Sequence, residues 1–142
     1  MLCCEEKSIN TRTFNYMMYC VEAAKKSNMR SKHGCIIVDC KGKIISKAYN
    51  KRNGLPDKHI DDPSKRPWFS KHAEETALLD CDRRKLNGAS LYVVRWGKIG
   101  TEHCFMNSKP CSKCTPIIKA CMKNHGLKAA YYSTGSKFEE IK

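Results

Sequence analysis

The sequence predicts an α/β fold, a three-layer α/β/α sandwich in which helices flank a mixed sheet of about five strands. Two observations predict it. Segments with helical periodicity and short β-branched segments alternate along the chain in the order α-β-β-α-β-α-β. The 142 residues are enough to bury a core, and their 41% hydrophobic content is ordinary for a globular protein. We therefore expect residues 1–142 to form a single domain.

In the first half of the chain, apolar residues at helical spacing predict a helix over residues 11–27. Gly34 precedes the β-branched run Cys35–Val38, which predicts a strand, and Ile44–Tyr49 returns as its hairpin partner. Residues 51–71 contain three prolines and few apolar side chains, so they predict a long loop. Ordered loops of this length are often functional.

In the second half, the sequence predicts two helices, three strands and a tail. The first helix should extend from Ala73 to Lys85 and be followed by a strand at Ser90–Arg95. A polar connection through the glycines at 97 and 100 then leads to the remaining elements, which are a short strand at His103–Met106, a helix at Ser112–Asn124, a strand at Ala129–Ser133 and a tail that frays or forms a short helix.

Two short motifs carry most of the chemical information, His72-Ala73-Glu74 and Pro110-Cys111-Ser112-Lys113-Cys114. Catalytic zinc takes three protein ligands and leaves a fourth position to water. His72, Cys111 and Cys114 supply one imidazole and two thiolates. If Ser112 opens a helix, both sulfurs lie on its first turn, where the partial positive charge of the helix start lowers thiol pKa. The motifs therefore predict a Zn²⁺ cofactor on these three residues.

Glu74 lies beside the predicted metal without being needed as a ligand. Zinc lowers the pKa of its water to about 7, and a free carboxylate nearby can move that water's protons. We therefore expect Glu74 to be the catalytic acid and base. The alternative is a structural zinc site, but such a site needs four protein ligands and has no use for Glu74.

The pairing H-x-E with P-C-x-x-C is the signature of zinc-dependent nucleobase deaminases. On these motifs the chain resembles the cytidine/deoxycytidylate deaminase superfamily, and it is also similar to the tRNA adenosine deaminases that share the fold. The likeness covers residues 14–133. It implies a cytidine deaminase-like fold, hydrolytic removal of the exocyclic amine of a cytosine nucleotide or nucleoside with release of ammonia, and self-association into a homo-oligomer.

Within the superfamily, the deoxycytidylate deaminase-like members are the closest match, because residues 126–132 resemble theirs and imply a substrate like dCMP. Three positions depart from the subfamily patterns. Thr76 stands where deoxycytidylate deaminases usually have asparagine, and His72 stands where cytidine deaminases use cysteine. Lys109 stands where tRNA deaminases commonly have glutamate. The identity of the substrate therefore stays open, and the extra length at residues 96–107 predicts an extended or irregular strand.

The resemblance also implies substrate contacts. Asn50 matches an asparagine that contacts sugar or base in relatives, although a residue at the end of a strand can equally be a turn residue. The Ala73 amide could polarise a base carbonyl. The Lys109 carbonyl is placed to accept from the departing amine, and its side chain could reach a phosphate. Trp68, among cations, could stack on a base, or could instead pin its loop to the core.

The formal net charge of +13 attracts polyanions. It is consistent with a nucleotide substrate, with RNA or single-stranded DNA, or with a basic surface that binds nothing. A second hypothesis is therefore deamination of cytosine or adenine within RNA or DNA. A third is a non-catalytic nucleic-acid-binding protein on a deaminase scaffold, against which the intact His72, Glu74, Cys111 and Cys114 argue.

The chain shows no sign of a membrane or secretory destination. No apolar run approaches the roughly 20 residues of a membrane span, and residues 1–6 lack a basic-then-apolar signal pattern. The ten cysteines include several among apolar neighbours, where a free thiol behaves as a small buried hydrophobe. We expect a reducing, intracellular setting, the cytoplasm with the nucleus as the alternative. No recognised spacing supports a second metal cluster among His103, Cys104, Cys121 and His125.

Overall fold

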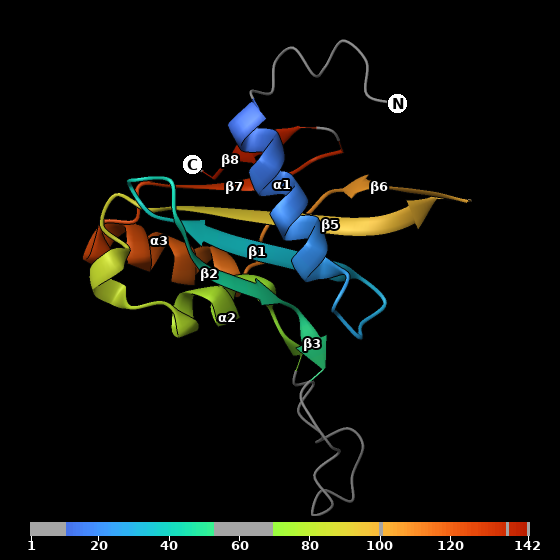
Figure 1. The fold of residues 1–142 in the computed structure, drawn as a ribbon. Helices are drawn as coiled ribbons and strands as arrows, with labels where there is room; N and C mark the ends of the chain where they lie inside the picture. Colours follow the sequence, from blue (N-terminus) through green and yellow to red (C-terminus); the bar gives the residue numbers. More distant parts are fainter. Residues whose placement is uncertain (1–10, 53–69, 100, 136, 142) are drawn as a thin grey trace, which may run out of the picture.

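A computed structural model of the protein describes residues 11–52, 70–99, 101–135 and 137–141 (Figure 1). Its elements in chain order are α1 (Thr11–Ala24), β1 (Lys32–Val38), β2 (Ile44–Tyr49), β3 (Lys51–Arg52), β4 (Ser70–Lys71), α2 (Ala73–Asp80), a 3₁₀ turn η3 (Arg83–Lys85), β5 (Ser90–Ile99), β6 (Glu102–Met106), α3 (Cys114–His125), β7 (Ala129–Ser133) and β8 (Phe138–Glu140). Among the described residues, every helix falls short of the length and apolar character that a membrane crossing requires.

The main sheet has six strands in the order β2-β1-β5-β7-β8, with β6 also paired to β5. β5 and β7 are parallel, and all other pairs are antiparallel. β7 pairs with the first part of β5, over Ser90–Val93, and β6 pairs with its last part, over Arg95–Ile99. The mixed sheet predicted from the sequence is therefore confirmed, with one more strand than the five expected.

Alternate residues of the central strands enter two separate cores. On one face, Cys35 and Ile37 of β1 pack with side chains of α2 and α3, including Ala77 and Ile118. On the other face, Ile36 of β1 packs with side chains of α1. Because successive strand residues point to opposite faces, one β-branched run covers both cores. Figure 1 shows the same arrangement, with α1 on one side of the sheet and α2 and α3 on the other. The predicted three-layer sandwich is confirmed.

Gly34 lets α1 approach the sheet closely. A Cβ placed on Gly34 would overlap the backbone carbonyl oxygen of Cys20 and lie 2.6 Å from the amide nitrogen of Ala24. Both atoms belong to the backbone of α1, so a side chain cannot be accommodated by a rotamer change. The glycine before β1 is therefore required by helix-on-sheet packing.

We expect Gly34→Ala to lower the free energy of unfolding by about 3 kcal/mol, at the upper end of the range for overpacked cores. Urea denaturation measures this. The matched control is Gly97→Ala, whose Cβ would meet the flexible thioether of Met106 rather than backbone, and it should cost less than about 1 kcal/mol. Equal losses in the two variants would contradict the packing explanation.

The helix predicted over Ala73–Lys85 ends five residues early, at Asp80. Cys81 is extended, with φ −91° and ψ 138°. The Asp82 carboxylate then accepts a hydrogen bond of 2.9 Å from the amide of Arg84 and caps the separate 3₁₀ turn. Aspartate competes with helical hydrogen bonding through such local contacts, which explains why one predicted helix is two shorter elements.

Two segments, the end of β5 and the tail, form strands that were predicted only in part or not at all. β5 continues through Gly97 to Ile99, where β6 pairs with it. This agrees with the extended strand predicted from the extra length at residues 96–107, whereas the polar connection predicted from Gly97 is wrong. The tail forms β8 instead of fraying or becoming helical. Gly135, with φ +82°, lies in the connection to β8. The ring of Phe138 packs against the ring of Tyr92 in β5, with 5.5 Å between the two ring centroids. Burial of that ring provides a reason for the tail to pair with β7.

Candidate metal centre

The starts of α2 and α3 meet at one end of the sheet. α2 precedes β5 and α3 precedes β7, and these two strands are parallel. Helices that lead into parallel strands begin at the strands' carboxyl end, where α/β folds bind ligands. Both motifs therefore lie at the same end of the sheet.

His72 is held at the start of α2 by its own backbone. Its amide donates to the Glu75 carboxylate at 2.9 Å, and its carbonyl accepts from the Thr76 hydroxyl at 2.9 Å. The Glu75 carboxylate also lies 3.4 Å from the ammonium of Lys113, which is in the segment Pro110–Cys114, called the cysteine loop below. Glu75 therefore connects the two motifs, a role that the sequence analysis missed, although a glutamate three residues after a helix N-cap is a known capping signal.

The cysteine loop turns helically before α3 begins. The first residue of α3 is Cys114, two residues later than the predicted start at Ser112. The amide of Thr115 nevertheless donates to the Cys111 carbonyl at 2.9 Å, and the Thr115 hydroxyl donates to the Pro110 carbonyl at 3.2 Å. Cys111 thus lies just before the helix and is exposed, while Cys114 lies in its first turn and is buried.

A pair of buried serines anchors the segment that leads into the cysteine loop. The Ser108 hydroxyl donates to the Val93 carbonyl at 2.9 Å, and the Ser133 amide donates to the Ser108 hydroxyl at 2.9 Å. The Ser108 amide in turn donates to the Ser133 carbonyl at 2.9 Å. These bonds attach residue 108 to the middle of β5 and to the end of β7. No sequence signal identified this pair, because isolated serines are common throughout loops and strands.

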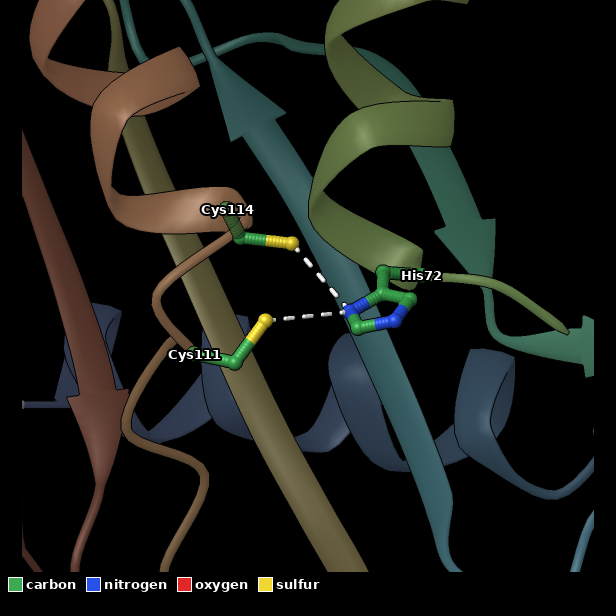
Figure 2. Close-up of side chains that lie close together, drawn as sticks. All are labelled: His72, Cys111 and Cys114. Carbon is green, nitrogen blue, oxygen red and sulfur yellow. Dashed lines mark hydrogen bonds between the residues drawn. The ribbon is translucent and has the colours of Figure 1, made fainter. Parts of the chain in front are cut away.

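The three predicted ligands converge. Figure 2 shows both cysteine sulfurs directed at the His72 ring, with Sγ to Nδ1 distances of 3.5 Å for Cys111 and 3.3 Å for Cys114. Zinc bonds of about 2.3 Å to sulfur and 2.0 Å to nitrogen, set at tetrahedral angles, put those atoms about 3.5 Å apart. The spacing therefore fits tetrahedral zinc. Within the described ranges, this is the one group of three such side chains close enough to hold a metal ion.

The charges around the group favour a bound cation. Burial, and then the nearby Glu74 carboxylate, raise the pKa of the Cys114 thiol well above its ordinary range. Without a cation, the buried thiol would stay protonated at neutral pH. A bound divalent ion reverses this preference and deprotonates a coordinating thiol. The donor set therefore suits a zinc-sized cation chemically as well as geometrically.

Glu74 is 5% exposed, next to the group. The pKa of the Glu74 carboxyl is raised to about 7, chiefly by burial and to a smaller extent by the charge of Glu75, against the opposing effect of hydrogen bonds from its own backbone amide and from Cys114. A carboxyl with this pKa can both take and give a proton near neutral pH. It is therefore suited to the acid and base role that the sequence predicts.

Asn50 closes the end of β2 onto the start of β1. Its side-chain oxygen accepts from the His33 amide at 2.8 Å, and its side-chain nitrogen donates to the Ser31 carbonyl at 2.6 Å. Asn50 is 7% exposed. These two hydrogen bonds support the role of a turn residue, which was one of the two roles expected for Asn50. The predicted contact between Asn50 and substrate stays a prediction.

The other predicted substrate contacts are placed as follows. Ala73 is fully buried at the first position of α2. Lys109 is exposed, and its amide donates a hydrogen bond of 2.8 Å to the Asn107 side-chain oxygen. Lys109 also lines a cavity of about 730 Å³ with residues of α3, β7 and β8. Trp68 lies outside the described residues.

Burial also affects a histidine that the sequence analysis did not single out. The pKa of His33 is lowered to about 4 by burial, then by the charges of Arg95 and His72. His33 is therefore neutral at pH 7, at the start of β1. Four of the cysteines, Cys20, Cys35, Cys81 and Cys121, are buried free thiols in the cores, and the expectation that several cysteines behave as small buried hydrophobes is confirmed.

Comparisons with known proteins give a consistent assignment. A crystal structure of cytidine deaminase from Burkholderia pseudomallei superposes with a TM-score of 0.58, at 15% identity, over 91% of each chain. The dCMP deaminase from the cyanophage S-TIM5 superposes in its apo form with a TM-score of 0.55, at 25% identity, over 94% of this chain and 86% of its own. The same enzyme in complex with dCMP and dUMP gives a TM-score of 0.52 at 24% identity, over 93% and 83%.

These superpositions share the fold described above, in agreement with the predicted cytidine deaminase-like architecture. No curated protein sequence matches the chain. The family described as the cytidine and deoxycytidylate deaminase zinc-binding region matches residues 11–128. The matched span contains the His72, Cys111 and Cys114 group and most of the sheet. The chain therefore belongs to the cytidine and deoxycytidylate deaminase family.

Proposed function

We propose that the protein is a zinc-dependent hydrolase that removes the exocyclic amine from the cytosine of a nucleotide or nucleoside, with dCMP as the representative substrate. The observation that carries the proposal is the convergence of His72, Cys111 and Cys114 beside the buried carboxyl of Glu74. Membership of the family supports a hydrolytic deaminase activity. The likeness to the S-TIM5 dCMP deaminase supports a nucleotide substrate.

In this proposal, His72, Cys111 and Cys114 hold the zinc ion. The zinc supplies Lewis-acid activation of water at neutral pH. Glu74 accepts the proton released when water adds to the ring carbon and passes it to the adjacent ring nitrogen. Glu74 then takes the proton of the new hydroxyl group on the ring carbon and gives it to the exocyclic nitrogen, the carbon–nitrogen bond breaks, and ammonia leaves as that oxygen becomes the carbonyl. Burial raises the pKa of the Glu74 carboxyl and so favours the protonated form that gives protons to the substrate.

The remaining residues position the base. The Ala73 amide, at the start of α2, is proposed to donate to the base carbonyl, where the helix start favours negative charge. Lys109 is proposed to receive the departing amine at its carbonyl and a substrate phosphate at its side chain. Asn50 and Trp68 remain proposed contacts to sugar or base. We also propose that the protein forms a homo-oligomer, which sedimentation equilibrium tests directly.

The test is ammonia release from dCMP, dCTP, cytidine and guanine by zinc-loaded protein, with and without a chelator. We expect turnover of dCMP above the other three, and loss of that turnover when the chelator removes the metal. Restoration by added zinc would exclude general damage by the chelator. Zinc-loaded protein that releases ammonia from none of the cytosine compounds would overturn the proposal.

A second candidate function is deamination of a base within a nucleic-acid strand, which the net charge of +13 favours. Single-stranded oligonucleotides carrying one cytosine or one adenine serve as the substrates for this test. Conversion of the oligonucleotide in preference to dCMP would make it the main activity.

A further inference from the structure

The end of β5 and β6 form a two-stranded hairpin that extends beyond the rest of the sheet (Figure 1). The paired residues are Arg95–Ile99 and Glu102–Met106, and their pairing includes Trp96 with Phe105 and Lys98 with His103. Because directly opposed residues in an antiparallel pair share a face, these four side chains lie on one face of the hairpin. Trp96 and Phe105 pack against the α1 core, so this is the α1 face of the sheet.

The rings on this face are arranged for stacking. The ring planes of Trp96 and His103 are 10° apart with centroids at 6.0 Å, and Phe105 meets Trp96 edge-on at 5.1 Å. His103 is exposed, and Trp96 and Phe105 are half-buried. We call Trp96, Lys98, His103 and Phe105 the hairpin patch. Part of its aromatic surface is therefore accessible.

The charge around the hairpin patch is positive. Lys98 is exposed within it, Lys32 of β1 is registered opposite Trp96, and Arg30 is exposed in the turn before β1. The Arg95 guanidinium donates a hydrogen bond of 3.3 Å to the Ser31 hydroxyl. This bond connects the turn to the first residue of the hairpin. The acidic residue of the hairpin, Glu102, is in register with Ile99, on the opposite face.

We propose that the hairpin patch binds single-stranded nucleic acid, with bases stacked on the Trp96 and His103 rings and phosphates paired with Lys98 and Lys32. Aromatic rings among cations recognise single strands without strong sequence preference, because every base has a flat ring and every linkage carries a negative charge. The net charge of +13 would add attraction at longer range. The proposal concerns binding and does not depend on the proposed deaminase activity.

The first measurement is the fluorescence of Trp96 in a Trp68→Phe background, in which Trp96 is the sole tryptophan of the chain. We expect a single-stranded RNA or DNA oligonucleotide to quench this emission, because a stacked base lies against the indole. The second measurement is the affinity of a labelled oligonucleotide by fluorescence anisotropy over a salt series. We expect log affinity to fall linearly with log salt.

Variants of the exposed members separate stacking from charge. His103→Ala should weaken binding about tenfold at fixed salt, through loss of a stacking ring. Lys98→Gln should make the slope of the salt plot shallower by about 0.7, the value for one phosphate contact on a single strand. Both side chains are exposed, so neither change should affect folding, and thermal unfolding of each variant checks this.

The matched control is Tyr19→Ala. Tyr19 is 42% exposed on α1, and the Lys47 ammonium lies 5.4 Å from the centre of its ring, so it is another ring beside a cation, away from the hairpin. It should leave oligonucleotide affinity unchanged. Inorganic polyphosphate, which has charge but no bases, should bind more weakly and leave Trp96 emission unchanged. Equal losses for Tyr19→Ala and His103→Ala, or polyphosphate binding as tight as that of the oligonucleotide, would overturn the proposal.

Discussion

Replacement of Glu74 by glutamine is expected to lower kcat for dCMP by about a thousandfold or more. A single acid–base group typically contributes about 10²–10⁴-fold, so the expected loss lies in the upper part of this range. The reason is that Glu74 serves several proton transfers in one turnover, and an amide can perform none of them. Glutamine has the same shape, and the site already favours an uncharged side chain, since burial raises the pKa of Glu74 to about 7. The variant should therefore fold normally.

The deciding measurement is zinc content beside kcat. Because Glu74 is proposed to act next to the metal and not on it, the Glu74→Gln protein should keep about one zinc ion per chain. Glu22→Gln, a change at an exposed glutamate of α1, is the control and should match the unmodified protein in both readouts. A Glu74→Gln protein that loses its zinc would show that Glu74 is a ligand or a support for one, and the proposed role would be wrong.

The site could be predicted from the sequence because its chemistry is concentrated in two short motifs. A histidine two residues before a glutamate and two cysteines three positions apart specify the donor atoms, and the helices that follow them specify where those atoms go. Cys111 and Cys114 are 39 and 42 residues from His72 in the chain, and their convergence follows once α2 and α3 lead into parallel strands. Local pattern and global topology therefore agree at this place.

The end of α2 at Asp80 was missed because a helical pattern continues past it, although the capping Asp82 is a local signal. The other features that could not be predicted depend on contacts between distant residues. β8 forms because the ring of Phe138 packs against the ring of Tyr92, which lies more than 40 residues earlier in the chain. The bonds between Ser108 and Ser133 join the segment after β6 to the end of β7, which only the folded sheet brings together. None of these partners is visible in a window of sequence, so periodicity alone cannot anticipate them.

The position of Asn50 illustrates the same limit within the site. Its place at the end of β2 was predicted from the hairpin pattern, and the resemblance to relatives added a possible substrate contact. The hydrogen bonds to His33 and Ser31 show that the side chain also joins β2 to the turn before β1. Any effect of changing Asn50 on catalysis would therefore need to be separated from an effect on the shape of this turn, because an unpaired buried amide partner costs about 1–3 kcal/mol.

Replacement of Cys111 by serine is expected to remove most of the bound zinc and, with it, the activity. A serine hydroxyl is a harder and less readily ionised donor than a thiolate, and soft ligands are what zinc sites of this type use. Changes in groups that merely support a ligand cost about 10–100-fold in metal affinity, so the loss of a direct ligand should exceed about 100-fold. Cys111 is the suitable ligand to change because it is exposed, whereas Cys114 is buried in the first turn of α3.

The matched control is Cys40→Ser, which removes an exposed thiol in the turn between β1 and β2 and should leave zinc content and activity unchanged. Elemental analysis after dialysis measures zinc per chain, and thermal unfolding with and without added zinc gives a second readout. A ligand that binds the folded state raises the unfolding temperature by mass action. Zinc should therefore stabilise Cys40→Ser strongly and Cys111→Ser weakly. If Cys111→Ser kept full zinc content, a donor other than Cys111 would hold the metal. The proposed set of three ligands with one open coordination position would then be wrong.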